Sequence, residues 1–473
     1  MTAEPASGAG ADAGVRPAAE ASTPASTPAS TPPAGAAAAA GVPHRWRNLL
    51  TLTGVTAVDS TEGSVTATLF PSIAAALGLD NGSLGLLGAL GKAASVPAGP
   101  LFVWLAGRVG RRAALVASTS LGGLFGILAG FSSGFGWLLL LNALMAAAVN
   151  GGNPIANAVI ADSFSDRERG RAAGILYGVT STVGSALGPL LALLTGFSDG
   201  WRYAMWAIGA VCLLSGLVVA TVYRDPGVGA AEEQLADLDE DVRERQRRPV
   251  TVRSVLGLFR IPTYALMMAS RLLSGHLLIL VFGVQFLASE RGFSNAVAAV
   301  VSLPFGLGYL AGTVGGGFLL GPVDRRWPDH GRAGYLQAAQ VFFAVAAFFG
   351  TQFHYPGGIA PYCVFWALMG VGQGLNPPVN RPVVAAVVLP ELRGQAFAVW
   401  LSVFETLGWG LFSILAGRLA ASLGLQGVFL WVLVVLMLAN AVLLGALHLT
   451  YRRDAHRVAD ALAERRRLAR DPG

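Results

Sequence analysis

The sequence predicts an all-α membrane protein with twelve transmembrane helices arranged as two halves of six. Three observations lead to this prediction: the composition, the number of long apolar runs, and the distribution of arginine between the loops. Of the 473 residues, 53% are hydrophobic and only 13% are charged, about half the charged share of an average soluble protein. The mean hydropathy is +0.57. A soluble chain of this composition would lack polar atoms to cover its surface, so a lipid bilayer is the expected solvent.

The chain begins with a segment, residues 1–43, that is rich in Ala, Pro, Ser and Thr. This composition offers too few large apolar side chains to bury a core, so the segment is predicted to be a disordered tail. It also lacks the basic start and the apolar run of a signal peptide. One long polar break divides the rest of the chain, which gives a six-helix half at 44–223, a cytoplasmic linker at 224–258, a second six-helix half at 259–450 and a basic cytoplasmic tail at 451–473.

Long apolar runs identify the predicted spans. A helix needs about 20 mostly apolar residues to cross the hydrocarbon core of a bilayer. Gly and Pro are frequent inside the runs, and a bundle tolerates them because neighbouring helices satisfy the backbone groups that they free. The twelve runs cover roughly residues 48–77, 83–106, 112–132, 136–161, 172–197, 202–223, 262–289, 294–320, 334–353, 359–389, 395–422 and 427–450.

The loops between the runs alternate between basic and nearly uncharged. Basic residues close to the membrane stay on the cytoplasmic side, so this alternation predicts a multi-pass protein of the cell membrane with both termini in the cytoplasm. The basic loops contain Arg45 and Arg47; Arg108, Arg111 and Arg112; Arg167, Arg169 and Arg171; Arg325, Arg326 and Arg332; Arg393; and the tail arginines Arg452, Arg453 and Arg465 to Arg467.

The two halves share an internal repeat. Five residues of the first half recur in the second half, and the interval is the same for every pair. They are Pro154, Arg169, Gly170, Ala172 and Gly184, which recur as Pro378, Arg393, Gly394, Ala396 and Gly408. Two parallel six-helix halves are one of the repeat plans that secondary transporters use.

At the loop after the second run, the sequence resembles the major facilitator superfamily, and the resemblance covers about residues 45–450. The family pattern there is G-x-L-A-D-R-x-G-R-R, and this chain matches its Leu-Ala, Arg and Gly-Arg-Arg positions. Val103 and Gly107 stand where the pattern has glycine and the acid. The equivalent loop of the second half retains an acid. The resemblance implies a cytoplasmic gate of charge pairs, weaker or differently built in the first half, with the gate residues Arg108, Gly110, Arg111, Arg112, Asp324 and Arg325.

Other matches to the family concern the direction of transport and the branch of the family. Gly184, Gly188 and Pro189 are similar to the glycine–proline signature of family antiporters, without the glycine pair that usually follows, and they imply close helix packing. Asn142 stands twelve residues before Pro154, where proton-coupled exporters of the family often carry arginine. The acid of the first run and the sequence Leu-Phe-Pro at 69–71 are similar to the spinster-like branch, which would imply an amphiphilic substrate.

Charged residues inside the runs of the first half are candidates for ion coupling, because such groups cost several kcal/mol in a membrane unless they are paired or face a cavity. Asp59 and Glu62 share one helix face through their i, i+3 spacing. Lys92, the only lysine of the chain, lies in the second run. We expect both acids to face a central cavity with Lys92 as their partner, so that a carboxylate alternates between protonated and paired states. The alternative is a static ion pair.

The second half adds Arg271 and His276 in the seventh run, Arg381 in the tenth and Glu405 in the eleventh. Arg381 belongs to Asn-Pro-Pro-Val-Asn-Arg-Pro at 376–382, which should interrupt a helix. Unwound backbone in a membrane is tolerated where it lines a cavity, so Arg381 and Glu405 are predicted to line one. The alternative for Arg271 is that its side chain extends to the cytoplasmic interface. The alternative for His276 is that it is a packing residue.

Together these features predict a secondary active transporter of small organic or amphiphilic molecules that exports them by alternating access, coupled to protons. One alternative is uptake of organic anions by proton symport, with Lys92, Arg271 and Arg381 as the binding cations. An alternative of another class is a non-transporting membrane receptor. No metal spacing, G-x-S-x-G or phosphate-binding loop favours an enzyme. The expected partners are a small-molecule substrate, protons and membrane lipid, with no cofactor, no nucleic acid and a monomeric chain.

Overall fold

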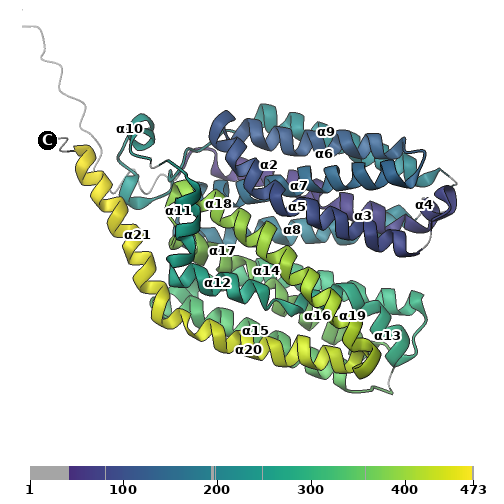
Figure 1. Ribbon diagram of the computed structural model, residues 1–473. Helices are drawn as coiled ribbons and strands as arrows, with labels where there is room; N and C mark the ends of the chain where they lie inside the picture. Colours follow the sequence, from purple (N-terminus) through teal and green to yellow (C-terminus); the bar gives the residue numbers. More distant parts are fainter. Residues whose placement is uncertain are drawn as a thin grey trace, which may run out of the picture.

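The computed structural model describes residues 42–470 except for residues 80, 193–196, 198, 248 and 357. All regular structure in this part of the chain is helical. The helices form two bundles that lie side by side with their long axes nearly parallel (Figure 1). The first bundle is drawn from purple to teal-blue and the second from teal to yellow, so each half of the sequence builds one bundle. The predicted all-α architecture of two halves is therefore confirmed.

The first bundle contains the helices α2 (Arg45–Asp59), α3 (Thr61–Thr68), α4 (Phe70–Leu77), α5 (Asn81–Val109), α6 (Arg111–Gly130), α7 (Phe135–Ser163), α8 (Asp166–Ala192) and α9 (Gly200–Val222). The first predicted span is thus divided into three helices. At the first break, the hydroxyls of Ser60 and Thr61 donate to the carbonyls of Ala57 and Val58 at 2.7 and 2.6 Å, which competes with regular helical bonding. At the second break, Pro71 has no N–H to donate.

The second bundle contains α12 (Pro262–Leu272), η4 (Gly275–Leu277), α13 (Leu278–Arg291), α14 (Asn295–Arg326), α15 (Gly331–Gln352), α16 (Ala360–Gly374), α17 (Pro377–Ala386), η5 (Pro390–Leu392), α18 (Arg393–Phe397), η6 (Ala398–Phe404), α19 (Glu405–Phe429), η7 (Leu430–Val435) and α20 (Leu436–Gly445). The segments η6 and η7 are π-helical. The gap between α16 and α17 is the interruption that the Asn-Pro-Pro sequence predicted.

Nine helices within the described residues are long and apolar enough to cross a membrane. The three other predicted spans coincide with α2–α4 and α16–α17, which are broken, and with α8. The chain is therefore a multi-pass membrane protein of the predicted class. The nine helices are Ser83–Val109, Arg111–Gly130, Phe135–Ser163, Gly200–Val222, Pro262–Arg291, Ala296–Arg326, Gly331–Gln352, Pro390–Ala420 and Ser422–Gly445.

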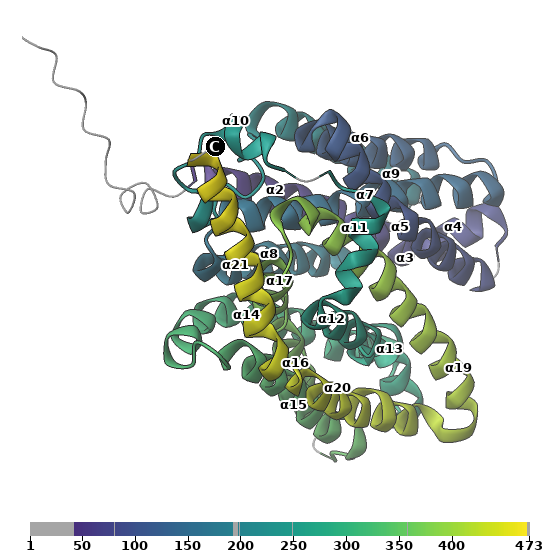
Figure 2. The ribbon, with the colours of Figure 1, turned by 60° about the vertical axis from the view of Figure 1, so that its left-hand side comes forward.

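The segment between the bundles forms four short helices: η2 (Glu233–Leu235), α10 (Glu240–Arg245), α11 (Val252–Gly257) and η3 (Leu258–Arg260). After the last span, the chain continues as α21 (Leu447–Arg470). This helix crosses one end of the molecule towards the linker (Figure 2). Its buried Asp454 accepts a hydrogen bond from the backbone N–H of Thr263 at 3.0 Å. The segment predicted as a basic tail is thus largely a helix that is fixed to the second bundle.

The bundles are in close contact near the end that α21 crosses. On α8, a Cβ atom at Gly174 would lie 2.4 Å from the carbonyl oxygen of Thr313 in α14. A Cβ atom at Gly170 would lie 2.5 Å from a methyl group of Leu320 and 2.8 Å from the carbonyl oxygen of Pro378. Such distances leave no room for a side chain, because heavy atoms pack at about 3.5–4.0 Å. Glycine on α8 therefore lets the two halves touch at this end.

Candidate functional site

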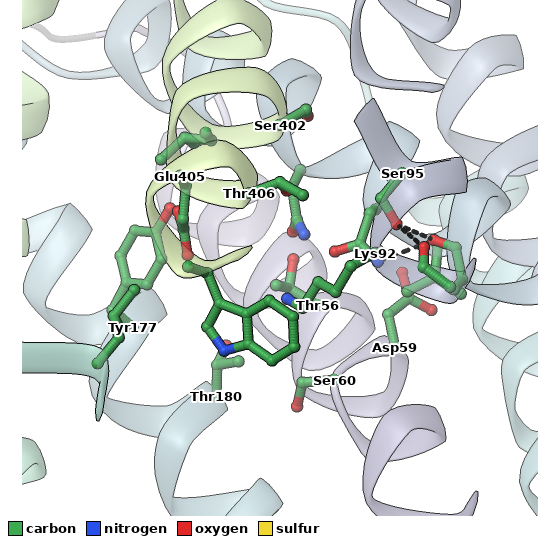
Figure 3. Close-up of a pocket in the computed structure, with 18 of the residues that line it drawn as sticks. Thr56, Asp59, Ser60, Lys92, Ser95, Tyr177, Thr180, Ser402, Glu405 and Thr406 are labelled. Carbon is green, nitrogen blue, oxygen red and sulfur yellow. Dashed lines mark hydrogen bonds between the residues drawn. The ribbon is translucent and has the colours of Figure 1, made fainter. Parts of the chain in front are cut away.

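A cavity of about 580 Å³ lies between the two bundles. Helices α2, α3, α5, α7 and α8 line it from the first bundle, and α12, η4, α14, α16, α17, η6 and α19 line it from the second. Hydroxyl groups from both bundles lie in its wall (Figure 3). Five of the six residues that the sequence analysis proposed for coupling line this cavity: Asp59, Lys92, Arg271, Arg381 and Glu405. The side chain of the sixth, Glu62, lies outside the described residues.

Asp59 is the buried acid of the first bundle. It is the last residue of α2, and its side chain lines the cavity. One carboxylate oxygen accepts a hydrogen bond from the hydroxyl of Thr119 at 3.2 Å. The other oxygen is buried and has no hydrogen-bond partner among the described residues. A buried carboxyl with so few partners favours its neutral, protonated form.

Lys92 projects into the same cavity from α5. Its ammonium lies 5.9 Å from the centre of the Trp409 ring. In the described part of the chain, no nitrogen–oxygen distance of 4.0 Å or less joins Lys92 to Asp59 or to another acid. The structure therefore places Lys92 and Asp59 in one cavity without the direct ion pair that the sequence analysis proposed.

Arg271 and Glu405 form an ion pair across the second bundle. Arg271 lies near the end of α12, and Glu405 is the first residue of α19. The side chain of Arg271 is 12% exposed and that of Glu405 is 30% exposed, towards the cavity that both line. Arg271 therefore faces the cavity, which is one of the two alternatives given above.

Arg381 lies on α17 just after the break in the tenth span. Its guanidinium lies 4.0 Å from the ring centre of Tyr177 and 5.2 Å from that of Trp400. It donates one hydrogen bond, of 2.7 Å, to the side-chain oxygen of Asn380. None of the acids that the structure describes pairs with it. Arg381 is thus a cation held by aromatic faces rather than by a counter-charge.

Sequence reasoning missed the aromatic partners of these cations. Trp400 was interpreted as a packing or interface residue, and it is almost fully buried. It also contacts both guanidiniums, because that of Arg271 lies 5.7 Å from its ring centre. Tyr177 carried no signal in the sequence, since it comes from the other half of the chain. Of the asparagines of α7, Asn142, Asn150 and Asn153 line the cavity.

His276 lies behind Arg271 in η4 and lines the cavity, although it is only 7% exposed. Its ring packs edge-on against Phe343, with 5.8 Å between the ring centres. Most of the His276 side chain is therefore packed against neighbouring residues, which is the alternative that the sequence analysis gave for this residue.

The end of the molecule with the arginine-rich loops, here called the basic end, is closed by ion pairs. Asp162 at the end of α7 pairs with Arg111 at 2.7 Å and with Arg393 at 2.8 Å. Glu232 of the linker pairs with Arg169 at 2.6 Å and with Arg393 at 2.5 Å. Each acid therefore bridges two arginines, and together they join the first bundle, the linker and the second bundle. We call these five residues the ion-pair layer.

Repeat symmetry is visible in this layer. The Nε atom of Arg169 donates to the carbonyl of Ala161 at 2.8 Å, and that of Arg393 donates to the carbonyl of Ala385 at 3.0 Å. The two arginines therefore have equivalent positions in the two halves. Burial alone would raise the pKa of the Glu232 carboxyl, but the paired guanidiniums of Arg393 and Arg169 lower this pKa to about 2.

A second group of charges lies beside the ion-pair layer. Arg332 pairs with Asp166 of the first bundle at 2.6 Å and with Asp324 of the second at 2.8 Å. Of the predicted gate residues, Arg111 and Asp324 thus take part in ion pairs between helices. Arg108 stacks on Trp104 with 4.2 Å to the ring centre.

The remaining gate residues have other roles or none in the described part of the chain. Arg112 donates to the carbonyl of Ala220. Gly110 separates α5 from α6 with a φ of 88°, which glycine adopts without strain. Arg325 makes no ion pair with any described residue. The sequence analysis missed Asp162 and Glu232, because neither lies in the motif that drew attention to the gate.

The predicted packing motif is only partly described. A Cβ atom at Gly184 would lie 3.7 Å from the hydroxyl of Ser60, an ordinary contact distance. The side-chain surroundings of Gly188 and Pro189 lie outside the described residues. On the same helix, the close approach to the other bundle is made by Gly170 and Gly174.

Comparison with known proteins agrees with this architecture. Two relatives are each 26% identical to the chain: the "Probable 4-methylmuconolactone transporter" of Cupriavidus pinatubonensis, over 258 residues, and the "3-(3-hydroxy-phenyl)propionate transporter" of Escherichia coli strain K12, over 245 residues. The alignments cover 50% and 51% of this chain and 59% and 57% of the relatives. The chain thus spans little more than half the length of these relatives.

Solved structures are similar in fold. The proton:xylose symporter XylE has a TM-score of 0.66 at 15% identity, with 86% of this chain and 96% of that chain covered. The human organic anion transporter MFSD10 has a TM-score of 0.64 at 17% identity, with 85% and 100% covered. A bacterial homologue of the lysosomal transporter Spinster has a TM-score of 0.52 at 19% identity, with 88% and 97% covered.

The sequence pattern of the Major Facilitator Superfamily matches residues 52–353, which is more than half of the chain. The match includes the whole first bundle after its first turns, the linker, and the second bundle as far as α15. The chain therefore belongs to the Major Facilitator Superfamily of secondary membrane transporters, and it is not an enzyme.

Proposed function

We propose that this transporter moves small organic anions across the membrane together with protons. The observation that supports it best is the guanidinium of Arg381, which lines the cavity without an acidic partner among the described residues. Three cations line the described cavity wall, Lys92, Arg271 and Arg381, and only Arg271 is ion-paired. Unpaired cations inside a membrane are costly unless they face a cavity, so a cavity that retains Lys92 and Arg381 without acidic partners is suited to an anionic ligand.

A carboxylate is the anion that fits this site best. The planar guanidinium of arginine donates two parallel hydrogen bonds to a carboxylate. Tyr177 and Trp400 offer aromatic faces beside Arg381, against which the ring of a substrate can pack. A volume of about 580 Å³ lies within the usual size of a small-molecule site. We therefore propose small carboxylates that carry a ring as the substrate class.

The names of the two relatives support the same class. One is named as a transporter of a phenylpropionate and the other as a probable transporter of a muconolactone. Both named compounds are small and contain a ring, and the first is a carboxylate. MFSD10, which is similar in fold, is named as an organic anion transporter.

Asp59 is proposed as the residue that couples protons to this movement. Protonation of Asp59 removes one negative charge from the cavity and so strengthens its attraction for an anion. By linkage, a bound anion favours the protonated carboxyl to the same extent. One monovalent anion that moves with one proton carries no net charge, and the membrane potential then does not oppose its entry.

Alternating access follows from the closed basic end. We assign this end to the cytoplasm, since short basic loops stay on that side. In the present arrangement the ion-pair layer would separate the cavity from the cytoplasm. Release into the cell requires that the bundles rock about the cavity and that Asp162 and Glu232 each lose one of their two arginines.

The test uses the purified chain in liposomes that contain a pH-sensitive dye. Addition of 3-phenylpropionate should acidify the interior faster than in liposomes without protein, whereas a lipophilic amine should give no such protein-dependent change. Arg381→Gln should abolish the difference, and Asp59→Asn should reduce it while exchange of labelled carboxylate continues. Arg253→Gln, at an exposed position of α11, is the matched control and should behave as the unchanged chain.

The sign of the pH change decides the direction of coupling. Acidification supports symport and uptake. Alkalinisation would mean that protons leave as the substrate enters, which is the antiport that the glycine–proline pattern favoured. Movement of amphiphilic cations without movement of any carboxylate would overturn the proposal.

A further inference from the structure

Glu405 lies where the positive charges of the cavity converge. It is paired with Arg271, and Lys92 and Arg381 both act on it electrostatically. These three residues are all the Lys and Arg side chains of the described cavity wall. A negatively charged ligand would be drawn to the place where the attraction of the three cations is combined, and the Glu405 carboxylate already occupies that place.

The backbone next to both members of the ion pair departs from regular α-helix. Arg271 lies one residue before the end of α12, and the following residues Leu273 and Ser274 are outside regular helix. Glu405 follows directly after the π-helical segment η6. Short π-helical segments inside α-helices are rare and occur frequently at functional sites. Arg271 is therefore attached near a helix end, and Glu405 to the junction of a π-helical and an α-helical segment within the continuous helix Pro390–Ala420.

We propose that the carboxylate of Glu405 occupies the subsite that the carboxylate of the substrate takes, so that the substrate displaces Glu405 from Arg271. This inference rests on the proposed function, because only an anionic substrate competes for the guanidinium. Glu405 is then a built-in competitor. It neutralises Arg271 while the cavity is empty. A substrate carboxylate binds Arg271 only if it interacts with the guanidinium more strongly than Glu405 does.

Displacement also moves a proton. The substrate oxygens accept the N–H groups of Arg271, and the released Glu405 carboxylate binds a proton from water in the cavity, since it has lost its counter-charge in a partly dehydrated site. When the substrate leaves, Glu405 returns the proton to water and pairs with Arg271 again. The ionisable groups that line the described cavity around Glu405 are Arg271, His276, Lys92, Arg381, Tyr177, Tyr309 and Asp59.

The first test is the affinity of Glu405→Gln for 3-phenylpropionate, measured by calorimetry on the detergent-solubilised full chain. Glutamine retains the shape of the side chain but cannot compete as a charge. We expect binding about tenfold tighter than in the unchanged chain, which corresponds to a gain of about 1.4 kcal/mol in binding free energy. The methyl ester of the same acid, which carries no charge, should show no gain. Weaker or unchanged binding of the carboxylate would overturn the inference.

A double-mutant cycle separates displacement from a general change of charge. In the background Arg271→Gln, the substitution Glu405→Gln should no longer tighten binding, since the guanidinium for which the two carboxylates compete is absent. Asp59→Asn also removes a negative charge from the cavity, so it should tighten binding as well. This gain in affinity should persist in the Arg271→Gln background. If the gain from Glu405→Gln persists as well, Glu405 acts by long-range charge alone and the proposed displacement is wrong.

Proton uptake on the unchanged chain keeps the inference testable if the variants do not fold. Calorimetry in buffers with different ionisation enthalpies counts the protons bound with the ligand. We expect uptake of more than one proton with 3-phenylpropionate, because Asp59 accounts for one at most, and no uptake with its methyl ester. Uptake of one proton or less would contradict the displacement step. If no carboxylate binds the unchanged chain at all, the proposed function fails. If carboxylates bind without the Glu405 effect, only this inference fails.

Discussion

The cavity and the basic end both contain arginines and acids, but they use them differently. In the ion-pair layer, Asp162 and Glu232 each bridge two arginines, and both acids are largely buried. In the cavity, Arg381 has no acidic partner and Asp59 has no cationic one within the described residues. Charges that are mutually satisfied hold the two bundles together. Charges that are left unsatisfied are available to a substrate or a proton.

The strongest test of this difference is Asp162→Asn. Asp162 is fully buried, and its loss leaves Arg111 and Arg393 with one counter-charge fewer. Removal of one partner from a buried ion pair costs about 3–5 kcal/mol, so the closed arrangement should be much less populated. A cysteine at Leu320, which is buried at the contact with α8, should then react readily with a maleimide after Cys212 and Cys363 are replaced by serine.

Asp59→Asn serves as the comparison in the same cysteine background, because it removes a buried acid that bridges nothing. Its maleimide reactivity at position 320 should match that of the unchanged chain. Equal reactivity of all three proteins would show that the ion-pair layer does not hold the basic end closed.

A smaller effect is expected from Gly174→Ala. The added methyl group would lie 2.4 Å from the carbonyl oxygen of Thr313, and this overlap is with backbone that cannot rotate away. Overpacking of this kind costs about 1–3 kcal/mol, so the melting temperature of the purified protein should fall. The matched control on the same helix is Gly184→Ala, where the nearest atom would lie 3.7 Å away. Equal melting temperatures for the two variants would place the contact between the bundles elsewhere.

The smallest effect is predicted for the pH dependence of the ion pairs that close the basic end. The pKa of Glu232 is about 2, below its ordinary value of 4.5, so its carboxylate stabilises the closed end at any pH above 4.5. That stabilisation is lost only as the pH falls from about 4.5 to about 2. Between pH 5 and 8, the pH profile of the initial transport rate should therefore have the same shape in Glu232→Gln as in the unchanged chain. A midpoint that moves within this range in the variant would contradict the paired state of Glu232.

Much of the fold and of the cavity was predictable because hydrophobic length and misplaced charge are local signals. Runs of apolar residues identified the spans, and the Asn-Pro-Pro sequence identified the break before Arg381. Five charged residues in the middle of spans were found to share one cavity, since the interior of a bundle is where charged groups in a membrane are tolerated.

The pairing of those charges was not predictable, because partners are chosen in three dimensions. The motif after the second span lacks its acid at Gly107, and the sequence analysis expected a weaker or differently built gate. In the structure the gate is built differently: Asp162, from the end of α7, pairs with Arg111. Lys92 and Asp59 were expected to pair, and the described distances do not join them. No periodicity in the sequence carries this information.

The place of Glu232 in the chain has a consequence for how a protein of two repeated halves arises. Equivalent arginines of the two repeats, Arg169 and Arg393, meet at the contact between the halves. Two copies of one ancestral unit would bring these like charges close together. The first half supplies separate acids, since Asp162 pairs with Arg393 and Asp166 with Arg169, but neither of them bridges the two arginines. The segment that joins the halves adds the acid that does, since Glu232 pairs with both. On this view the connecting peptide contributes a contact between the repeats that a duplicated unit alone would lack.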